Sequence, residues 1–124
     1  MAQKAIVHKE GKVLIVRNHG EDIWDLPGGH LDQSEHPLEG ICREIQEETG
    51  LPVADCTLSA VDTFIDNRNG EQYVLLIYTT EAPHTDVVPQ EDELADIRWV
   101  GKEDLGKVEL FPEYQKAVEQ FFSN

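Results

Sequence analysis

One stretch of the chain limits its possible folds more than any other: GHLDQSEHPLEGICREIQEETGL, residues 29–51. Placed on a helix at about 100° per residue, it puts glutamates on one face and apolar side chains on the adjoining face. Pro37 suits a first helical turn, Ser34 or His36 suits the position before it, and Gly50 suits the residue after the last turn. The stretch therefore predicts an amphipathic helix that begins and ends by local rules.

The acidic face of this predicted helix differs from an ordinary solvated surface. An exposed helix usually places Lys four residues after Glu, whereas Glu44 is followed at that spacing by Glu48, and residues 29–51 contain no Lys. Like charges at this spacing repel each other, and Arg43 is the one cationic residue among them. A hard cation bound by carboxylate oxygens would offset the repulsion, and Mg²⁺ or Mn²⁺ fits best because these ions use a few carboxylates together with substrate phosphates.

The same stretch resembles the signature of the Nudix family, G-x5-E-x7-R-E-U-x-E-E-x-G-U, in which U is a bulky aliphatic residue. The segment before it, residues 24–29, looks like the strand and Pro-Gly-Gly loop that lead into the Nudix helix. Family members often have glycine before the first glutamate and two alanines before the arginine, and here those positions hold Ser34, Gly40 and Ile41. Every specified position of the signature is filled, by Gly29, Glu35, Arg43, Glu44, Ile45, Glu47, Glu48, Gly50 and Leu51.

The resemblance implies both a fold and a reaction. The fold class would be α/β, as the Nudix αβα sandwich with a mixed β-sheet. The reaction would be metal-dependent hydrolysis of a nucleoside diphosphate linked to another group, by attack of water at phosphorus. Nucleoside triphosphates and dinucleoside polyphosphates are slightly favoured, because the sequence lacks the markers expected of enzymes for ADP-ribose, NADH or coenzyme A. The alternative is a Nudix-like module that binds nucleotide or metal without turnover. A calcium-buffering protein would need an Asp/Asn-rich loop that this sequence lacks.

The signature residues have separate expected roles. Arg43, Glu44 and Glu47 are expected to be catalytic, with Arg43 holding the carboxylates by bidentate hydrogen bonds, a task to which Lys is poorly suited. Glu35 would ligate a further metal ion or orient water. The expected metal ligands are Gly29, by way of a backbone carbonyl in the Gly-Gly loop, and the carboxylates of Glu35, Glu44, Glu47 and Glu48.

A further catalytic group is expected outside the signature. Many Nudix enzymes carry a loop glutamate six residues before the Trp of an Arg-Trp pair, and here that residue is Glu93, before Trp99. Glu93 is therefore the expected base, and Glu91 and Asp92 are the next candidates. Each of these acids could instead be a solvated loop residue without a catalytic role.

Candidate substrate-binding residues flank the signature. His30 follows the glycine pair and is expected to contact phosphate together with Gly28. Trp24 and Trp99 are expected to stack on a base, although an aromatic residue beside a strand is more often part of the core.

Composition predicts one small enzyme domain over residues 1–124. The chain has 40% hydrophobic residues, no stretch long enough to span a bilayer and no signal-peptide core, so we expect a cytoplasmic protein without membrane contact, as a monomer or homodimer. With 25 acidic against 10 basic residues, its net charge of −15 argues against binding long nucleic acids. A small nucleotide that binds with its own Mg²⁺ remains compatible. Cys42 and Cys56 are expected to be buried thiols outside any disulfide framework.

The order of elements along the chain can also be predicted. Residues 5–8 and 13–17 read as a hairpin, and so do residues 53–65 and 72–80, which flank an Asn-Gly turn. Residues 81–92 read as a loop, 97–100 as a strand, and 114–122 as a closing helix with Val118, Phe121 and Phe122 facing inward.

Overall fold

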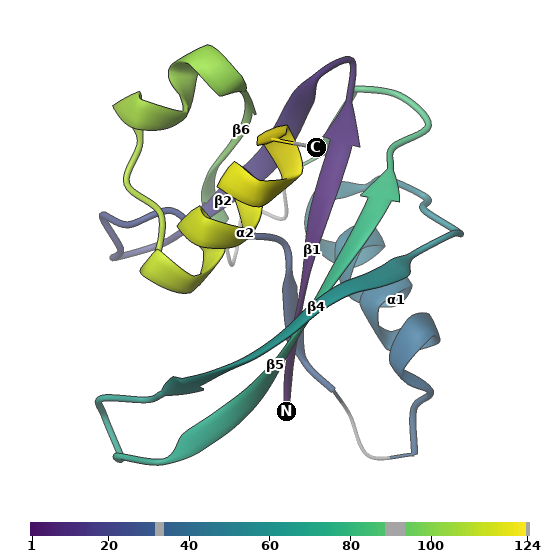
Figure 1. The fold of residues 1–124 in the computed structure, drawn as a ribbon. Coiled ribbons are helices and arrows are strands. Elements are labelled where there is room, and N and C mark those ends of the chain that lie inside the picture. Colours follow the sequence, from purple (N-terminus) through teal and green to yellow (C-terminus); the bar gives the residue numbers. More distant parts are fainter. Residues whose placement is uncertain (32–33, 89–93, 124) are drawn as a thin grey trace.

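The computed structural model describes residues 1–31, 34–88 and 94–123, and shows a mixed β-sheet between two α-helices (Figure 1). The strands are β1 (Ala2–Lys9), β2 (Lys12–Asn18), β3 (Gly28–His30), β4 (Thr57–Ile65), β5 (Gln72–Glu81) and β6 (Leu94–Gly101). The helices are α1 (Pro37–Thr49), the 3-10 helix η1 (Lys102–Lys107) and α2 (Pro112–Ser123).

Strand β1 lies at the centre of the sheet. The strand order is β4-β5-β1-β2-β6, and β3 also pairs with β1. The β1–β5 pair is parallel, whereas the other pairs are antiparallel. The sheet stays open, and with a helix on each face it confirms the αβα sandwich that the resemblance implies.

Both faces of the central strands β1 and β2 are largely buried, which explains their nearly continuous apolar runs. Successive side chains of a strand point to opposite faces. Ile6 of β1 packs with Val118 of α2 in one apolar cluster, the α2-side cluster. The next residue, Val7, packs with Ile41 and Ile45 of α1 in a second one, the α1-side cluster. The period-two pattern of the strands thus places α1 and α2 on opposite sides.

Helix α1 starts and stops as its sequence predicts. His36 is the N-cap, and its Nδ1 accepts a hydrogen bond from the backbone N–H of Leu38. Pro37 occupies the first turn. Gly50 ends the helix with a φ of 76°, a left-handed conformation that glycine adopts without strain.

The predicted hairpins are present, although β1 begins earlier and β4 later than predicted. β1 and β2 form one hairpin, and β4 and β5 form the other around the turn at residues 66–70. Strand β4 begins at Thr57 rather than at Val53. The prediction of a strand from residue 53 was wrong because Val53 packs into the α1-side cluster and the Asp55 carbonyl accepts a hydrogen bond from the Thr80 hydroxyl.

The C-terminal part follows the prediction more closely. Strand β6 includes the expected residues 97–100, and α2 contains the expected helix with Val118 buried and Phe121 and Phe122 packed against the core. The 3-10 helix η1 was not predicted. Within residues 1–31, 34–88 and 94–123, neither α-helix has the length and apolar character needed to cross a membrane.

Candidate active site

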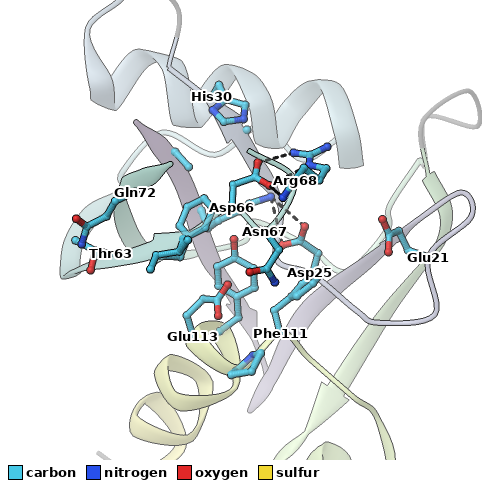
Figure 2. Close-up of a pocket in the computed structure, with 17 residues that line it drawn as sticks. Glu21, Asp25, His30, Thr63, Asp66, Asn67, Arg68, Gln72, Phe111 and Glu113 are labelled. Carbon is cyan, nitrogen blue, oxygen red and sulfur yellow. Dashed lines mark hydrogen bonds and ion pairs between the residues drawn. The ribbon is translucent and has the colours of Figure 1, made fainter. Parts of the chain in front are cut away.

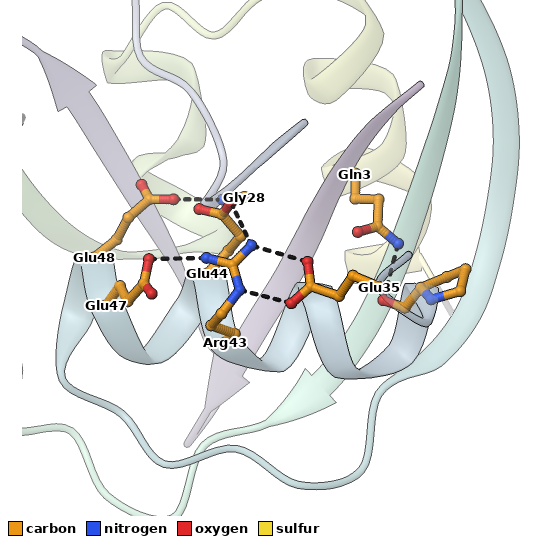
Figure 3. Close-up of polar contacts among 8 residues, drawn as sticks. Gln3, Gly28, Glu35, Arg43, Glu44, Glu47 and Glu48 are labelled. Carbon is orange, nitrogen blue, oxygen red and sulfur yellow. Dashed lines mark hydrogen bonds and ion pairs between the residues drawn. The ribbon is translucent and has the colours of Figure 1, made fainter. Parts of the chain in front are cut away.

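Arg43 organises the acidic face of α1 (Figure 3). Its Nε and Nη2 donate to the two carboxylate oxygens of Glu35, at 2.7 and 3.0 Å. Its Nη1 donates to Glu47 at 3.0 Å, and Nη2 also donates to Glu44 at 3.2 Å. The guanidinium therefore bridges three carboxylates at once, which offsets much of the repulsion expected from the sequence.

The loop before α1 is shaped to bring Glu35 to this guanidinium. Ser34 has a φ of 71°, which explains why glycine is common at that position. A Cβ at Gly40 would lie 2.9 Å from Glu35 Oε1, so the glycine leaves space for the carboxylate. Hydrogen bonding to Arg43 lowers the pKa of Glu35 and keeps it ionised.

Glu48 is held in a different way from the other three glutamates. Its side chain is buried, with 7% exposed, and Oε1 accepts a hydrogen bond from the backbone N–H of Gly28 at 3.0 Å. Burial raises the pKa of Glu48 to about 7, against the opposing effects of the Gly28 hydrogen bond and the nearby charge of Lys4. At neutral pH, Glu48 is thus a carboxyl group whose charged form is disfavoured in the absence of a cation.

The glycine pair lets β3 approach both β1 and α1. Gly28 has a φ of 145°, and a Cβ there would lie 2.1 Å from the carbonyl oxygen of Gln3. A Cβ at Gly29 would lie 3.0 Å from Glu44 Oε1. A Cβ at Gly28 would force β3 away from the backbone of β1, whereas a Cβ at Gly29 would require the Glu44 carboxylate to shift.

The donor set suits the divalent cation that the resemblance implies. Mg²⁺ and Mn²⁺ bind carboxylate oxygens, and a cation beside Glu48 would favour the charged form that burial disfavours. In the part of the chain that the structure describes, no three His, Cys, Asp or Glu side chains are already grouped to hold an ion. Glu35, Glu44 and Glu47 contact Arg43 instead. Cation binding therefore requires carboxylates to move part of their contact from Arg43 to the metal.

A cavity of about 870 Å³ opens beside this site (Figure 2). Gly29 and His30 of β3 form part of its wall, so the cavity reaches the strand that touches Glu44. The β4–β5 hairpin, β1 and the start of α2 provide most of the remaining wall. Its described lining includes Lys4, Glu21, Asp25, Phe64, Asp66, Asn67, Arg68, Phe111, Glu113 and Tyr114.

Acidic groups outnumber basic ones in the described lining of the cavity. Both cations contact an acid: Lys4 Nζ lies 3.3 Å from Asp25, and Arg68 Nη2 lies 2.8 Å from Asp66. Hydrogen bonds from Arg68 lower the pKa of Asp66 to about 2. The described wall therefore combines an excess of carboxylates with the apolar rings of Phe64 and Phe111.

The predicted substrate residues fall into different places. His30 lines the cavity, and Gly28 lies two residues before His30 on the same strand, β3. Trp24 is 7% exposed, belongs to the α2-side cluster and has the Arg98 guanidinium 4.9 Å from its ring centre. Trp99 packs against the α1-side cluster and donates to the Thr85 carbonyl. Neither tryptophan is among the described residues that line the cavity, and stacking on a base stays a prediction for both.

The predicted base lies outside the described residues, and so do both alternatives. Glu93, Glu91 and Asp92 fall in the segment 89–93, immediately before β6. Their role stays a prediction from the sequence.

Sequence reasoning missed most of the cavity. Asp25 lies in the segment that leads into the signature, but nothing in the sequence marked it as a cavity residue. Asp66 and Arg68 fall in the predicted turn, which they do form, and Glu113 lies just before the predicted helix 114–122. Only the folded chain brings these segments together.

Comparison with known proteins agrees with this geometry. The sequence profile of the NUDIX domain matches residues 3–121. An RNA pyrophosphohydrolase of Halorhodospira halophila is 44% identical over 50 residues, which cover 40% of this chain and 28% of that protein's length. The phosphatase NudJ of Shigella boydii is 29% identical over 106 residues, which cover 82% of this chain and 68% of NudJ.

Solved structures match over nearly the whole length. The crystal structure of a MutT NUDIX hydrolase from Burkholderia pseudomallei superposes with a TM-score of 0.79 and 29% identity, covering 96% of this chain and 95% of that one. The profile match spans nearly all of the present sequence, and the signature acids lie together on α1 and the loop before it. The chain therefore belongs to the Nudix family.

Proposed function

We propose that this protein is a metal-dependent Nudix pyrophosphohydrolase that cleaves a nucleoside diphosphate linked to another group. One observation carries the proposal. Gly29 lines the cavity and also lies against the Glu44 carboxylate, so a ligand in the cavity can place a phosphate beside the acids of α1. Strand β3 therefore borders both the cavity and the candidate metal ligands on α1.

The residues of α1 have distinct parts in this proposal. Glu44, Glu47 and Glu48 would hold Mg²⁺ or Mn²⁺, with help from a backbone carbonyl at Gly29. The ion supplies neutralisation of phosphate charge and a bound water of lowered pKa. Arg43 positions Glu44 and Glu47 through the hydrogen bonds described above. Glu35 anchors the other side of the guanidinium and orients water or a further ion.

The cavity is proposed to bind the nucleoside part. A polyphosphate would be repelled by the excess of carboxylates in its lining, whereas a base and a sugar bring N–H and O–H donors. Phe64 and Phe111 can pack against a base, and His30 follows Gly29 in the cavity wall, beside which the phosphates would lie. Nucleoside triphosphates and dinucleoside polyphosphates remain the slightly favoured substrates.

The bond changes follow from attack at phosphorus. A water oxygen forms a bond to phosphorus while the bridging P–O bond breaks, and the departing phosphate keeps the bridging oxygen. The proton of the attacking water passes to a base, for which Glu93 is the proposed residue. Solvent oxygen should therefore enter a phosphate product.

Steady-state turnover tests the reaction directly. Purified protein should hydrolyse at least one member of a panel of nucleoside triphosphates, dinucleoside polyphosphates and diphosphate sugars with Mg²⁺, and lose activity in excess chelator. Glu47→Gln should lower kcat on the order of 10³-fold because it removes a metal ligand. Glu39→Gln is the matched control, since Glu39 is an exposed carboxylate on the first turn of the same helix.

Product analysis in ¹⁸O-water tests the site of attack. Label on phosphate supports attack at phosphorus, and label on the sugar carbon would overturn the assignment. Binding of nucleotides without any turnover would instead indicate the alternative, a non-catalytic Nudix module. A cytoplasmic setting and a monomeric or homodimeric state belong to the same proposal, and gel filtration with light scattering tests the latter.

A further inference from the structure

The two cysteines of this chain lie side by side in the fold. Cys42 is on α1 and Cys56 is the last residue before β4, yet their Sγ atoms are only 3.5 Å apart. A sulfur–sulfur bond is about 2 Å long, so the two atoms need to approach by only about 1.5 Å. We infer that Cys42 and Cys56 are an oxidative modification site, which closes to a reversible intramolecular disulfide.

The surroundings of Cys56 allow this approach. The connection 50–56 between α1 and β4 has no regular secondary structure, so Cys56 can shift without breaking a ladder hydrogen bond of β4. The Cys42 thiol already points at this connection, with Sγ 3.9 Å from the carbonyl oxygen of Ala54. Both cysteines are partly exposed, so a small oxidant can reach the pair.

Other uses of this thiol pair fit less well. A structural zinc site needs four ligands, and the described part of the chain holds no group of three or more His, Cys, Asp or Glu that could bind a metal. Burial and the Cys42 neighbour raise the pKa of Cys56 to about 12, so at neutral pH Cys56 keeps its proton and is a poor nucleophile by itself. Oxidation to a disulfide is the chemistry that uses both sulfurs at this separation.

Exchange with a small disulfide oxidises the pair in two steps. The Cys42 thiolate attacks one sulfur of glutathione disulfide, forms a mixed disulfide and releases one glutathione thiolate. Cys56 then loses its proton to solvent, attacks Cys42 Sγ and releases the second glutathione thiolate. Two protein thiols are oxidised and one small disulfide is reduced to two thiols.

Intact-mass measurement tests the pair, because the chain has no other cysteine. After incubation with glutathione disulfide, the wild type should be two hydrogen atoms lighter, carry no glutathione and show no free thiol. Cys56→Ser should instead accumulate one glutathione on Cys42, since the second step is missing. Cys42→Ser should react more slowly, because only the protonated Cys56 is left. Dithiothreitol should restore both wild-type thiols.

Oxidation should also be visible in stability. The disulfide closes a loop of about 15 residues, which should raise the thermal midpoint of the wild type by about 5 °C or more and leave both serine variants unchanged. A second oxidant, diamide, which takes up the two hydrogens without forming glutathione adducts, provides an independent route. The inference is overturned if the wild type keeps both thiols with both oxidants, gains two glutathiones, or forms only disulfides between chains.

Discussion

The buried carboxyl group of Glu48 leads to a prediction in which charge, pH and metal act on one side chain. In Glu48→Gln, the amide oxygen can still accept the Gly28 N–H. The substitution therefore removes the charge while keeping the hydrogen bond.

The size of the effect follows from the two pKa values of Glu48. In the unfolded chain the carboxyl loses its proton near the ordinary value of 4.5, and in the folded protein it does so near 7. Between these values the folded state holds a proton that the unfolded state has lost, so stability falls as pH rises. At about 1.4 kcal/mol per pH unit, the full cost above pH 7 is about 3 kcal/mol. Repulsion between Glu44 and Glu48 alone would contribute only a few tenths of a kcal/mol.

Thermal and urea melts in EDTA between pH 4.5 and 8.5 measure this cost. Glu48→Gln should match the wild type near pH 4.5 and exceed it by about 3 kcal/mol at pH 8, which corresponds to about 10 °C in the midpoint. Millimolar Mg²⁺ at pH 8 should raise the wild-type midpoint and raise that of the variant much less, because a ligand stabilises through its affinity for the folded state.

Glu47→Gln is the matched control for this experiment. Glu47 lies one residue earlier on α1, and its side chain is 54% exposed. Its substitution should change stability in EDTA by less than about 1 kcal/mol. A constant difference between Glu48→Gln and wild type across the pH range, or a less stable variant at pH 8, would refute the reasoning. An equal rise of the thermal midpoint with Mg²⁺ in the wild type and in Glu48→Gln would show that Glu48 is not a metal ligand.

Three further substitutions test the remaining parts of the site. Arg43→Lys should lower kcat by about 10- to 100-fold while the far-ultraviolet circular dichroism stays unchanged, because Lys cannot bridge three carboxylates; a wild-type rate would contradict the positioning role. Gly28→Ala should destabilise the protein by more than about 3 kcal/mol in urea melts, because its Cβ would meet a β1 carbonyl. Gly70→Ala is the control, since Gly70 also has a positive φ but lies in open space, and this change should cost about 1 kcal/mol. Glu93→Gln should reduce kcat by about 10²-fold or more with Mg²⁺ affinity nearly unchanged, and an unaffected rate would move the base to Glu91.

The sequence was sufficient wherever local rules decide the structure. The limits of α1 depend on His36, Pro37 and Gly50, each of which acts on its neighbours in sequence. The Asn-Gly turn of the β4–β5 hairpin is likewise decided by its own residues. The signature spacing also placed Glu47 near Arg43, because residues four apart share a helix face.

Features that depend on distant segments could not be predicted. The burial of Glu48 requires β3 to lie against α1, and β3 is held there by pairing with β1. The cavity joins the β4–β5 turn, around Asp66, to the start of α2, around Glu113, which are adjacent only after folding. The proximity of Cys42 and Cys56 likewise depends on the path of the connection 50–56.

The central position of β1 has a consequence for how the chain folds. Residues 2–8 pair in parallel with residues 75–81, so the middle of the sheet cannot form until more than half of the chain is available. Closing such a long loop costs entropy before any pairing is gained, and proteins with contacts of this kind fold slowly compared with those built from local contacts. During synthesis on the ribosome, the backbone groups of β1 that pair with β5 would stay unpaired until β5 has been made. Unpaired strands of this kind favour association between chains, so the yield of folded protein should depend on how quickly residues 72–81 follow.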